Sequence, residues 1–242
     1  MGLIMACIGS TCLALTPVAD QEKLRLGRDA GAINSAFFAD QSGQPQGGII
    51  IASTAQNNSH KLQGLAHNLA EYGWTSLIIE LPMISPTQDP DDPAAQPADT
   101  ESAQMTDAEY LALAIEFMQA EKGQFNLVLL ALNASWPRLS PTIGANQKTN
   151  LKLQGFILLD VDVATKLDQL PKGVPTLDIA NQRTTPVDFD DRKRQAKHYR
   201  LTKYQQVNLG PAARLYSLAE SRFTRRVRGW LRTNVQGMEL GK

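Results

Sequence analysis

The sequence has almost no cysteine, little histidine and no excess of charge of either sign. Its two cysteines, Cys7 and Cys12, lie near the N-terminus, and the rest of the chain has none. That remainder can therefore form neither a disulfide framework nor a cysteine-based metal site. Lysine and arginine number 24, the same as aspartate and glutamate, so the net charge gives no support for a nucleic-acid partner.

The composition is that of a chain with a sizeable core. Hydrophobic residues make up 43% of the 242 residues and charged residues 20%, which is typical of a folded protein. The sequence shows no internal repeat and no heptad pattern. One domain is the simplest interpretation of this length.

The first 19 residues differ from the rest because they contain no charged side chain. The apolar runs at 3–8 and 13–15 are typical of a secretory signal, although no Lys or Arg precedes them and the cleavage pattern is poor. We expect residues 1–19 to be an export leader, uncleaved or truncated in this sequence, followed by the folded domain over 20–242. An ordinary buried first segment is the alternative. The leader is short and is interrupted by Gly9 and Pro17, which argues against a membrane span there, and no transmembrane span is expected beyond it.

Strand-like and helix-like segments alternate after the leader. Short apolar runs predict strands, and apolar residues at helical spacing predict helices. Strands that are apolar throughout, separated by amphipathic helices, predict an α/β fold with a mainly parallel central sheet and helices on both faces. The predicted strands are 33–38, 47–52, 74–81, 125–130, 153–159, 174–180 and 204–209, and the predicted helices are 60–72, 106–120 and 211–233.

Three local patterns mark the ends of predicted elements. Gly73 is expected to end the first helix, because glycine readily takes the left-handed conformation found there. Thr106 is expected to cap the second helix, which opens with the acidic residues Asp107 and Glu109. Residues 83–105 are rich in proline and acidic side chains, so we expect a flexible loop there.

Four segments carry a resemblance to a known family, namely Gly48–Ile51, Leu65–Pro82, Pro175–Ile179 and Arg225–Leu231. Together they resemble a bacterial family of uncharacterised α/β-hydrolase-like proteins, known as a domain of unknown function. The resemblance extends over about residues 20–233 and implies a single α/β-hydrolase-like domain without an established activity. Members often begin with an export signal, so it also implies a periplasmic or envelope location, with a cytoplasmic location as the alternative.

The nucleophile of a hydrolase is missing from its expected position. Many α/β hydrolases carry it in the pattern G-x-S-x-G, at a sharp turn between a strand and a helix. The aligned residues here are 131–135, which place Asn133 where the serine would lie. The side-chain amide of asparagine cannot form an acyl-enzyme, so this position predicts no serine-hydrolase chemistry.

The acid and the base of a triad are also missing from their expected loops. The segment 181–186 has no carboxylate, Asp188 comes late, and 208–213 has no histidine. The three histidines, His60, His67 and His198, lie elsewhere. The sequence therefore predicts no catalytic, cofactor-binding or metal-binding residues and no cofactor.

Two enzyme alternatives remain open at this point. Ser135 could serve a serine esterase with an atypical base, although a serine at a turn or before a helix is commonly structural. Asp160 and Asp162 follow an apolar strand, as in Mg²⁺-dependent phosphatases of the haloacid-dehalogenase type, with residues 188–191 as further acidic ligands. Aspartates that end a strand are also common turn formers.

The C-terminal segment combines arginines with apolar residues. We interpret its arginines as the solvated face of a docked helix that buries Trp230 and Leu231, with a membrane or nucleic-acid patch as the alternative. Residues 191–194 are likewise expected to be an exposed helix face. The arginines are Arg222, Arg225, Arg226, Arg228 and Arg232.

The leading hypothesis is a non-catalytic envelope protein. It would bind a protein partner or a small ligand through the cleft that a hydrolase uses for catalysis, or through the acidic loop 83–105. A scaffolding role is a third hypothesis, and no nucleic-acid partner is expected.

Overall fold

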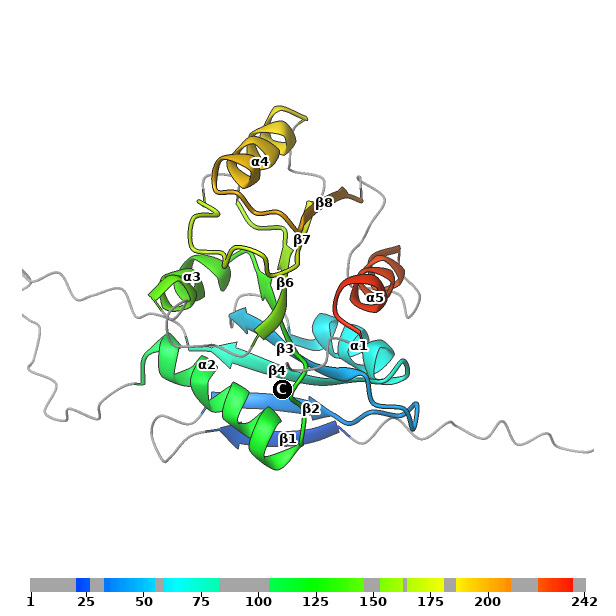
Figure 1. Ribbon diagram of the computed structural model, residues 1–242. Helices are drawn as coiled ribbons and strands as arrows, with labels where there is room; N and C mark the ends of the chain where they lie inside the picture. The colour runs from blue at the N-terminus through cyan, green and yellow to red at the C-terminus, as the bar shows by residue number, and fades with distance from the viewer. Residues whose placement is uncertain are drawn as a thin grey trace, which may run out of the picture.

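The computed structural model describes residues 21–26, 33–54, 59–82, 105–145, 153–162, 165–180, 186–209 and 222–236. The predicted leader 1–19 lies outside the described residues, as does nearly all of the predicted loop 83–105. The described residues form one α/β domain built around a central sheet (Figure 1).

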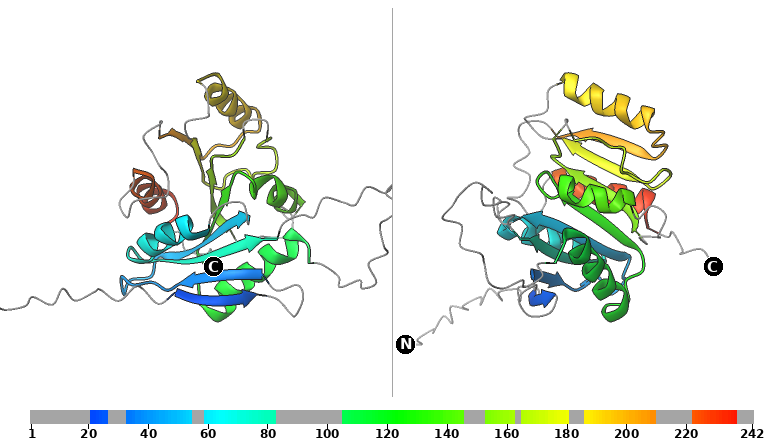
Figure 2. Two further views of the ribbon diagram at one scale, coloured as in Figure 1. Left: turned by 180° about the vertical axis from the view of Figure 1, so that it is seen from behind. Right: turned by 90° about the vertical axis from the view of Figure 1, so that its left-hand side faces the viewer.

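The central sheet has eight strands in the order β1-β2-β4-β3-β5-β6-β7-β8. The pairs β1–β2 and β2–β4 are antiparallel, and all other neighbouring strands are parallel. Figure 2 shows the strands stacked from β1 at one end to β8 at the other. The strands are β1 Gln21–Leu26, β2 Ile33–Phe38, β3 Gly47–Thr54, β4 Trp74–Leu81, β5 Leu127–Leu132, β6 Leu153–Leu159, β7 Thr176–Ala180 and β8 Tyr204–Asn208.

Helices cover both faces of the sheet, as the alternating pattern predicts. The helices α1 (Ser59–Ala70) and α5 (Arg222–Asn234) pack on one face, and α2 (Asp107–Glu116) and α3 (Trp136–Ala145) pack on the other (Figure 1). The helix α4 (Pro186–His198) joins the same core as α2 and α3. Each face therefore has its own hydrophobic core, with the sheet between them.

The central strands are apolar because both of their faces are buried. Every residue of β3 and of β5 is buried, and so is every residue of β7. The predicted strands 33–38, 74–81 and 153–159 are confirmed to the residue. Four others are confirmed in place, with ends that differ by up to two residues from the prediction.

The strand β1 was not predicted from the sequence. Charged and apolar residues alternate only in its second half, Lys23–Leu26, where Leu24 and Leu26 pack against the core. The strand lies at the edge of the sheet and is paired on one side only, with β2. An edge strand with one solvated face lacks the continuous apolar run that marks the buried strands.

The predicted ends of the first two helices are confirmed. Gly73 follows α1 with φ of +89°, and a Cβ there would lie 2.6 Å from the backbone oxygen of Gln44. Thr106 caps α2: its side chain accepts a hydrogen bond from the Glu109 backbone N–H, and the Glu109 carboxylate accepts one from the Thr106 backbone N–H. A π-helical turn, η2 (Phe117–Glu121), continues α2 to the length that the sequence predicts.

The C-terminal helix α5 docks as expected. Its side chains Phe223, Val227, Trp230 and Leu231 are buried, which confirms the prediction for the last two. Gly155 in β6 makes room for the helix, since a Cβ there would lie 3.0 Å from the Trp230 ring. The predicted residues 211–221 of this helix lie outside the described residues. None of the helices in the described ranges is both long and apolar enough for a bilayer crossing.

Candidate functional site

The candidate site lies at the carboxyl ends of the parallel strands. The chain passes from β3 through α1 to β4 on one side, and from β4 through α2 to β5 on the other side of β3. Ligands of open α/β sheets bind at such a reversal, just outside the carboxyl ends of the strands. Asn133 follows β5 at this position, where the G-x-S-x-G pattern places a nucleophile.

Asn133 differs from an activated nucleophile in both contacts and backbone. Its side chain is exposed, and its Oδ1 accepts a hydrogen bond of 3.1 Å from the backbone N–H of Asp162, at the end of β6. Hydrolase nucleophiles sit on a sharp, strained turn. In the described ranges, the non-glycine residues with positive φ are Asp160 and Arg200, so Asn133 has no such strain. The amide joins the ends of two neighbouring strands.

Ser135, the serine of the esterase alternative, is fully buried. Its Oγ lies 2.8 Å from the Ala52 carbonyl oxygen and 2.9 Å from that of Leu132, and it accepts a 2.9 Å hydrogen bond from the Leu132 N–H. The hydroxyl therefore ties the turn after β5 to the end of β3. An oxygen with no exposed surface and only backbone partners is poorly placed to attack a substrate.

The histidines of the described chain stand apart from Ser135. His67 lies in α1, with its Nε2 3.5 Å from the Glu71 carboxylate, and His198 ends α4 with its ring against Tyr199. The side chain of His60 lies outside the described residues, as do most of the loops in which the acid and the base of a triad are expected.

Asp160 and Asp162, the residues of the phosphatase alternative, follow β6 directly. Asp160 has φ of +57°, and its backbone N–H donates to the Ile179 oxygen at 2.9 Å. Asp188 and its acidic neighbours lie in α4. No group of three metal-binding side chains occurs in the part of the chain that the structure describes. Asp160 thus ends a strand in a tight turn, as the structural interpretation predicts.

A buried ionic cluster near the β8 end was not predicted. The Asp178 carboxylate of β7 accepts hydrogen bonds from Arg192 Nε of α4, at 3.1 Å, and from the Tyr204 hydroxyl of β8. Asp178 is 3% exposed and Arg192 is 2% exposed. The prediction that 191–194 are an exposed helix face is therefore wrong for Arg192. The clue was the lone carboxylate in an apolar strand, which needs a buried partner.

The environment of this cluster shifts two pKa values. Burial raises the pKa of the Asp178 carboxyl, while the nearby Arg192 guanidinium and the Tyr204 hydrogen bond oppose that rise. Burial also raises the pKa of the Tyr204 hydroxyl, and the Asp178 charge adds to the effect. Arg192 donates from Nη1 to the Thr165 carbonyl at 2.6 Å, while its Nη2 has no hydrogen-bond partner in the described structure. The cluster binds α4 to the sheet.

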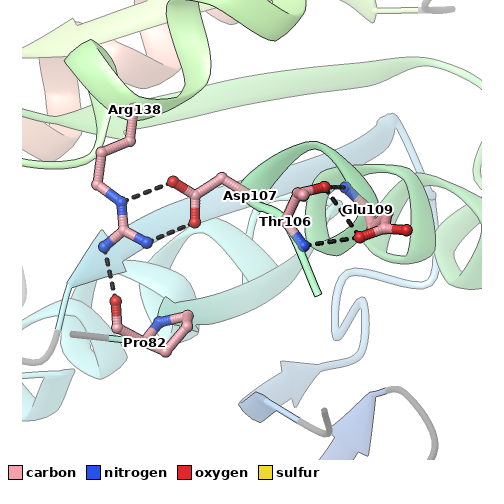
Figure 3. Close-up of polar contacts among 5 residues, drawn as sticks. All are labelled: Pro82, Thr106, Asp107, Glu109 and Arg138. Carbon is pink, nitrogen blue, oxygen red and sulfur yellow. Dashed lines mark hydrogen bonds and ion pairs between the residues drawn. The ribbon is translucent and has the colours of Figure 1, made fainter. Parts of the chain in front are cut away.

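A second ion pair and a hydrogen bond from the same arginine link the residues on either side of the segment 83–104 to α3 (Figure 3). Arg138 of α3 makes a bidentate contact with the carboxylate of Asp107, the first residue of α2, in which Nε donates at 2.7 Å. Its Nη1 donates to the carbonyl oxygen of Pro82, just after β4, at 2.7 Å. The sequence predicts Asp107 in a first helical turn but does not reveal this partner.

The comparison with family models covers nearly the whole chain. Residues 12–233 match the model described as protein of unknown function (DUF3530). The chain belongs to this family. The predicted resemblance to a domain of unknown function is thereby confirmed. None of the curated proteins is similar enough in sequence to match.

The solved structures that this family member resembles include a hydrolase, an esterase domain and a hydrolase homologue. A dienelactone hydrolase from Anabaena variabilis superposes with a TM-score of 0.60 at 13% identity, covering 90% of this chain and 99% of the other. The esterase domain of a Rhodothermus marinus protein gives 0.60 at 12%, covering 89% and 99%. An α/β serine hydrolase homologue from Coxiella burnetii gives 0.59 at 13%, covering 90% and 99%. At these identities the likeness shows the fold, which is the α/β-hydrolase fold.

Proposed function

We propose that this chain is a non-catalytic α/β-hydrolase-like protein of the bacterial envelope. It would bind a protein partner or a small ligand, either at the carboxyl ends of its strands or through the acidic segment 83–105. The observation that carries the proposal is the state of the nucleophile position. Asn133 has an ordinary backbone conformation there, and its side-chain oxygen is bonded to the neighbouring strand end.

Chemistry at this position supports a binding role over turnover. An acyl-enzyme needs a hydroxyl or thiol that a base can deprotonate, whereas a carboxamide offers neither. The exposed Asn133 amide instead provides two N–H donors and an acceptor to a bound group. The nearest replacement hydroxyl, on Ser135, is buried and bonded to backbone groups.

The envelope location is supported by the uncharged apolar segment 1–19 and by the family resemblance. Cell fractionation tests it directly. We expect the protein in the periplasmic or the membrane-associated fraction. The mass of the recovered protein shows whether the leader has been removed. Recovery of the native protein in the cytoplasmic fraction would contradict the location and leave the binding role open.

Labelling with a fluorophosphonate probe tests the absence of catalysis. We expect the folded full-length protein to remain unlabelled and to leave p-nitrophenyl esters intact, while an active α/β hydrolase is labelled in parallel. A labelled residue is to be identified by mass spectrometry of its peptide and not by a Ser135→Ala variant. That substitution removes a buried hydrogen-bonded hydroxyl and can disturb folding. Stoichiometric labelling mapped to Ser135 would overturn the proposal in favour of the esterase.

A further inference from the structure

A polar groove runs between the edge strand β8 and the helix α5. It encloses about 680 Å³, which is within the range of small-molecule sites. Gln205 and Asn208 of β8 line one wall, and Arg222, Arg225 and Arg226 of α5 line the other. Figure 1 shows these two elements at the side of the domain that carries α1. The groove is separate from the turn that holds Asn133, so the inference below goes beyond the proposed function.

The three arginines of the groove lie on one face of α5. Positions three and four apart share one helix face, so Arg222, Arg225 and Arg226 form one cationic surface. All three side chains are exposed. In the described ranges no carboxylate forms an ion pair with any of them, whereas Arg138 and Arg192 do have acidic partners. The groove therefore holds three positive charges without a neutralising partner among the described side chains.

Two further residues of α5 shape the groove. Gly229 lies one turn beyond the arginines, and a Cβ built there would meet nothing within 4 Å. The absence of a side chain leaves the groove open at this position. Trp230 also lines the groove and is 3% exposed, and its indole Nε1 is buried without a hydrogen-bond partner. A buried donor without a partner is costly unless a bound group or water supplies an acceptor.

We propose that this groove binds a phosphate group, carried either by a soluble small molecule or by a lipid headgroup. Guanidinium groups bind phosphate oxygens in bidentate geometry. A phosphate monoester carries close to two negative charges at neutral pH, which suits a site with several unpaired cations better than a single carboxylate does. The amide side chains of Gln205 and Asn208 supply polar contacts for the remainder of the ligand.

Calorimetric titration of the full-length protein with inorganic phosphate and with pyrophosphate tests the soluble source. We expect saturable binding of pyrophosphate that weakens about tenfold or more in the double variant Arg225→Gln/Arg226→Gln, because charge-assisted hydrogen bonds are lost. Arg232→Gln is the matched control, since Arg232 is exposed on the same helix but does not line the groove. Glutamine is a good helix former, so these variants are expected to fold.

Trp230 lines the groove, so its indole N–H signal reports on a ligand bound close to that side chain. The chain has three tryptophans, so three such signals are expected in an NMR spectrum of the labelled protein. Pyrophosphate is expected to shift the Trp230 signal, which Trp230→Phe identifies by its loss. The signals of Trp74 and Trp136, which lie in other parts of the core, are expected to remain unchanged.

Sedimentation with vesicles that contain phosphatidic acid, whose headgroup is a phosphate monoester, tests the lipid source, with phosphatidylcholine vesicles, which carry no net charge, as the reference. Binding to anionic vesicles alone, lost in Arg225→Gln/Arg226→Gln and kept in Arg232→Gln, would support the proposal and assign the phosphate to a lipid. Equal weakening by Arg232→Gln would show attraction to helix charge in general and would overturn the proposal. Absence of binding to pyrophosphate and to both vesicles would also overturn it.

Discussion

Replacement of Arg138 by methionine is expected to destabilise the domain through one identified contact. Methionine keeps an apolar stem of similar length and removes every guanidinium donor. The variant loses the bidentate contact with Asp107 and the hydrogen bond to the Pro82 oxygen. Both charged side chains are mostly buried, with 15% of Arg138 and 20% of Asp107 exposed.

The expected loss is about 2 kcal/mol in the free energy of unfolding. Breaking a fully buried ion pair costs roughly 3–5 kcal/mol, whereas an exposed pair contributes about 0–1 kcal/mol. This pair lies between these limits. Asp107 also retains a favourable position in the first turn of α2, which reduces the cost of leaving its charge unpaired. In a domain of this size, about 2 kcal/mol corresponds to a fall in Tm of roughly 4–8 °C.

A double-mutant cycle with Asp107→Asn isolates the pair. We expect a coupling of about 1–2 kcal/mol between the two substitutions, measured by urea unfolding followed by circular dichroism. Arg194→Met is the matched control, because Arg194 is a helical arginine that contacts Asp191 but is 72% exposed. Additive effects at Arg138 and Asp107, or a Tm change no larger than that of Arg194→Met, would refute the reasoning.

Three further predictions concern separate features of the structure. Tyr204→Phe is expected to reduce the loss of stability at alkaline pH. The pKa of the Tyr204 hydroxyl in the folded protein lies above its ordinary value of about 10, so the stability that this shift contributes is complete below that pH and is lost as the pH rises above it. Unfolding measured across alkaline pH checks this, and an unchanged slope would contradict it. Gly229→Ala is expected to stabilise α5 by about 0.5–1 kcal/mol, since the site is open and helical, and a lower urea midpoint would refute that. Asn133→Ser is expected to stay unlabelled by fluorophosphonate, because the turn lacks the strained backbone of a nucleophile elbow; labelling at the new serine would disprove this.

The buried strands and the helix caps could be predicted because each has a local cause. The strand 74–81 holds the apolar run Leu77–Ile79 between Trp74 and Leu81, and Thr106 with Glu109 forms a capping box within four residues of sequence. The edge strand β1 could not be predicted, because pairing on one side and solvent on the other leave only Leu26 buried and Leu24 partly buried. Its place in the sheet depends on pairing with β2, and the local sequence of β1 does not reveal that pairing.

The candidate site also has features that the sequence predicts and features that it does not. The position of Asn133 follows from a strand and a turn that are visible in the sequence, and the structure places it there. Its bond to the Asp162 backbone, and the pairing of Arg192 with Asp178, join residues 29 and 14 positions apart through the arrangement of the strands and helices. Charge runs such as 191–194 indicate a helix but not which of its charges is buried.

The contact of Arg138 with Pro82 and Asp107 also bears on how this domain tolerates changes in chain length. Because one guanidinium holds both residues, the chain leaves β4 and returns to α2 at nearly the same point. Closing a loop between two fixed ends costs only about 0.6 kcal/mol more for each doubling of its length. The connection between them is therefore a natural place for insertions and deletions, and relatives can differ in length there while keeping the same sheet.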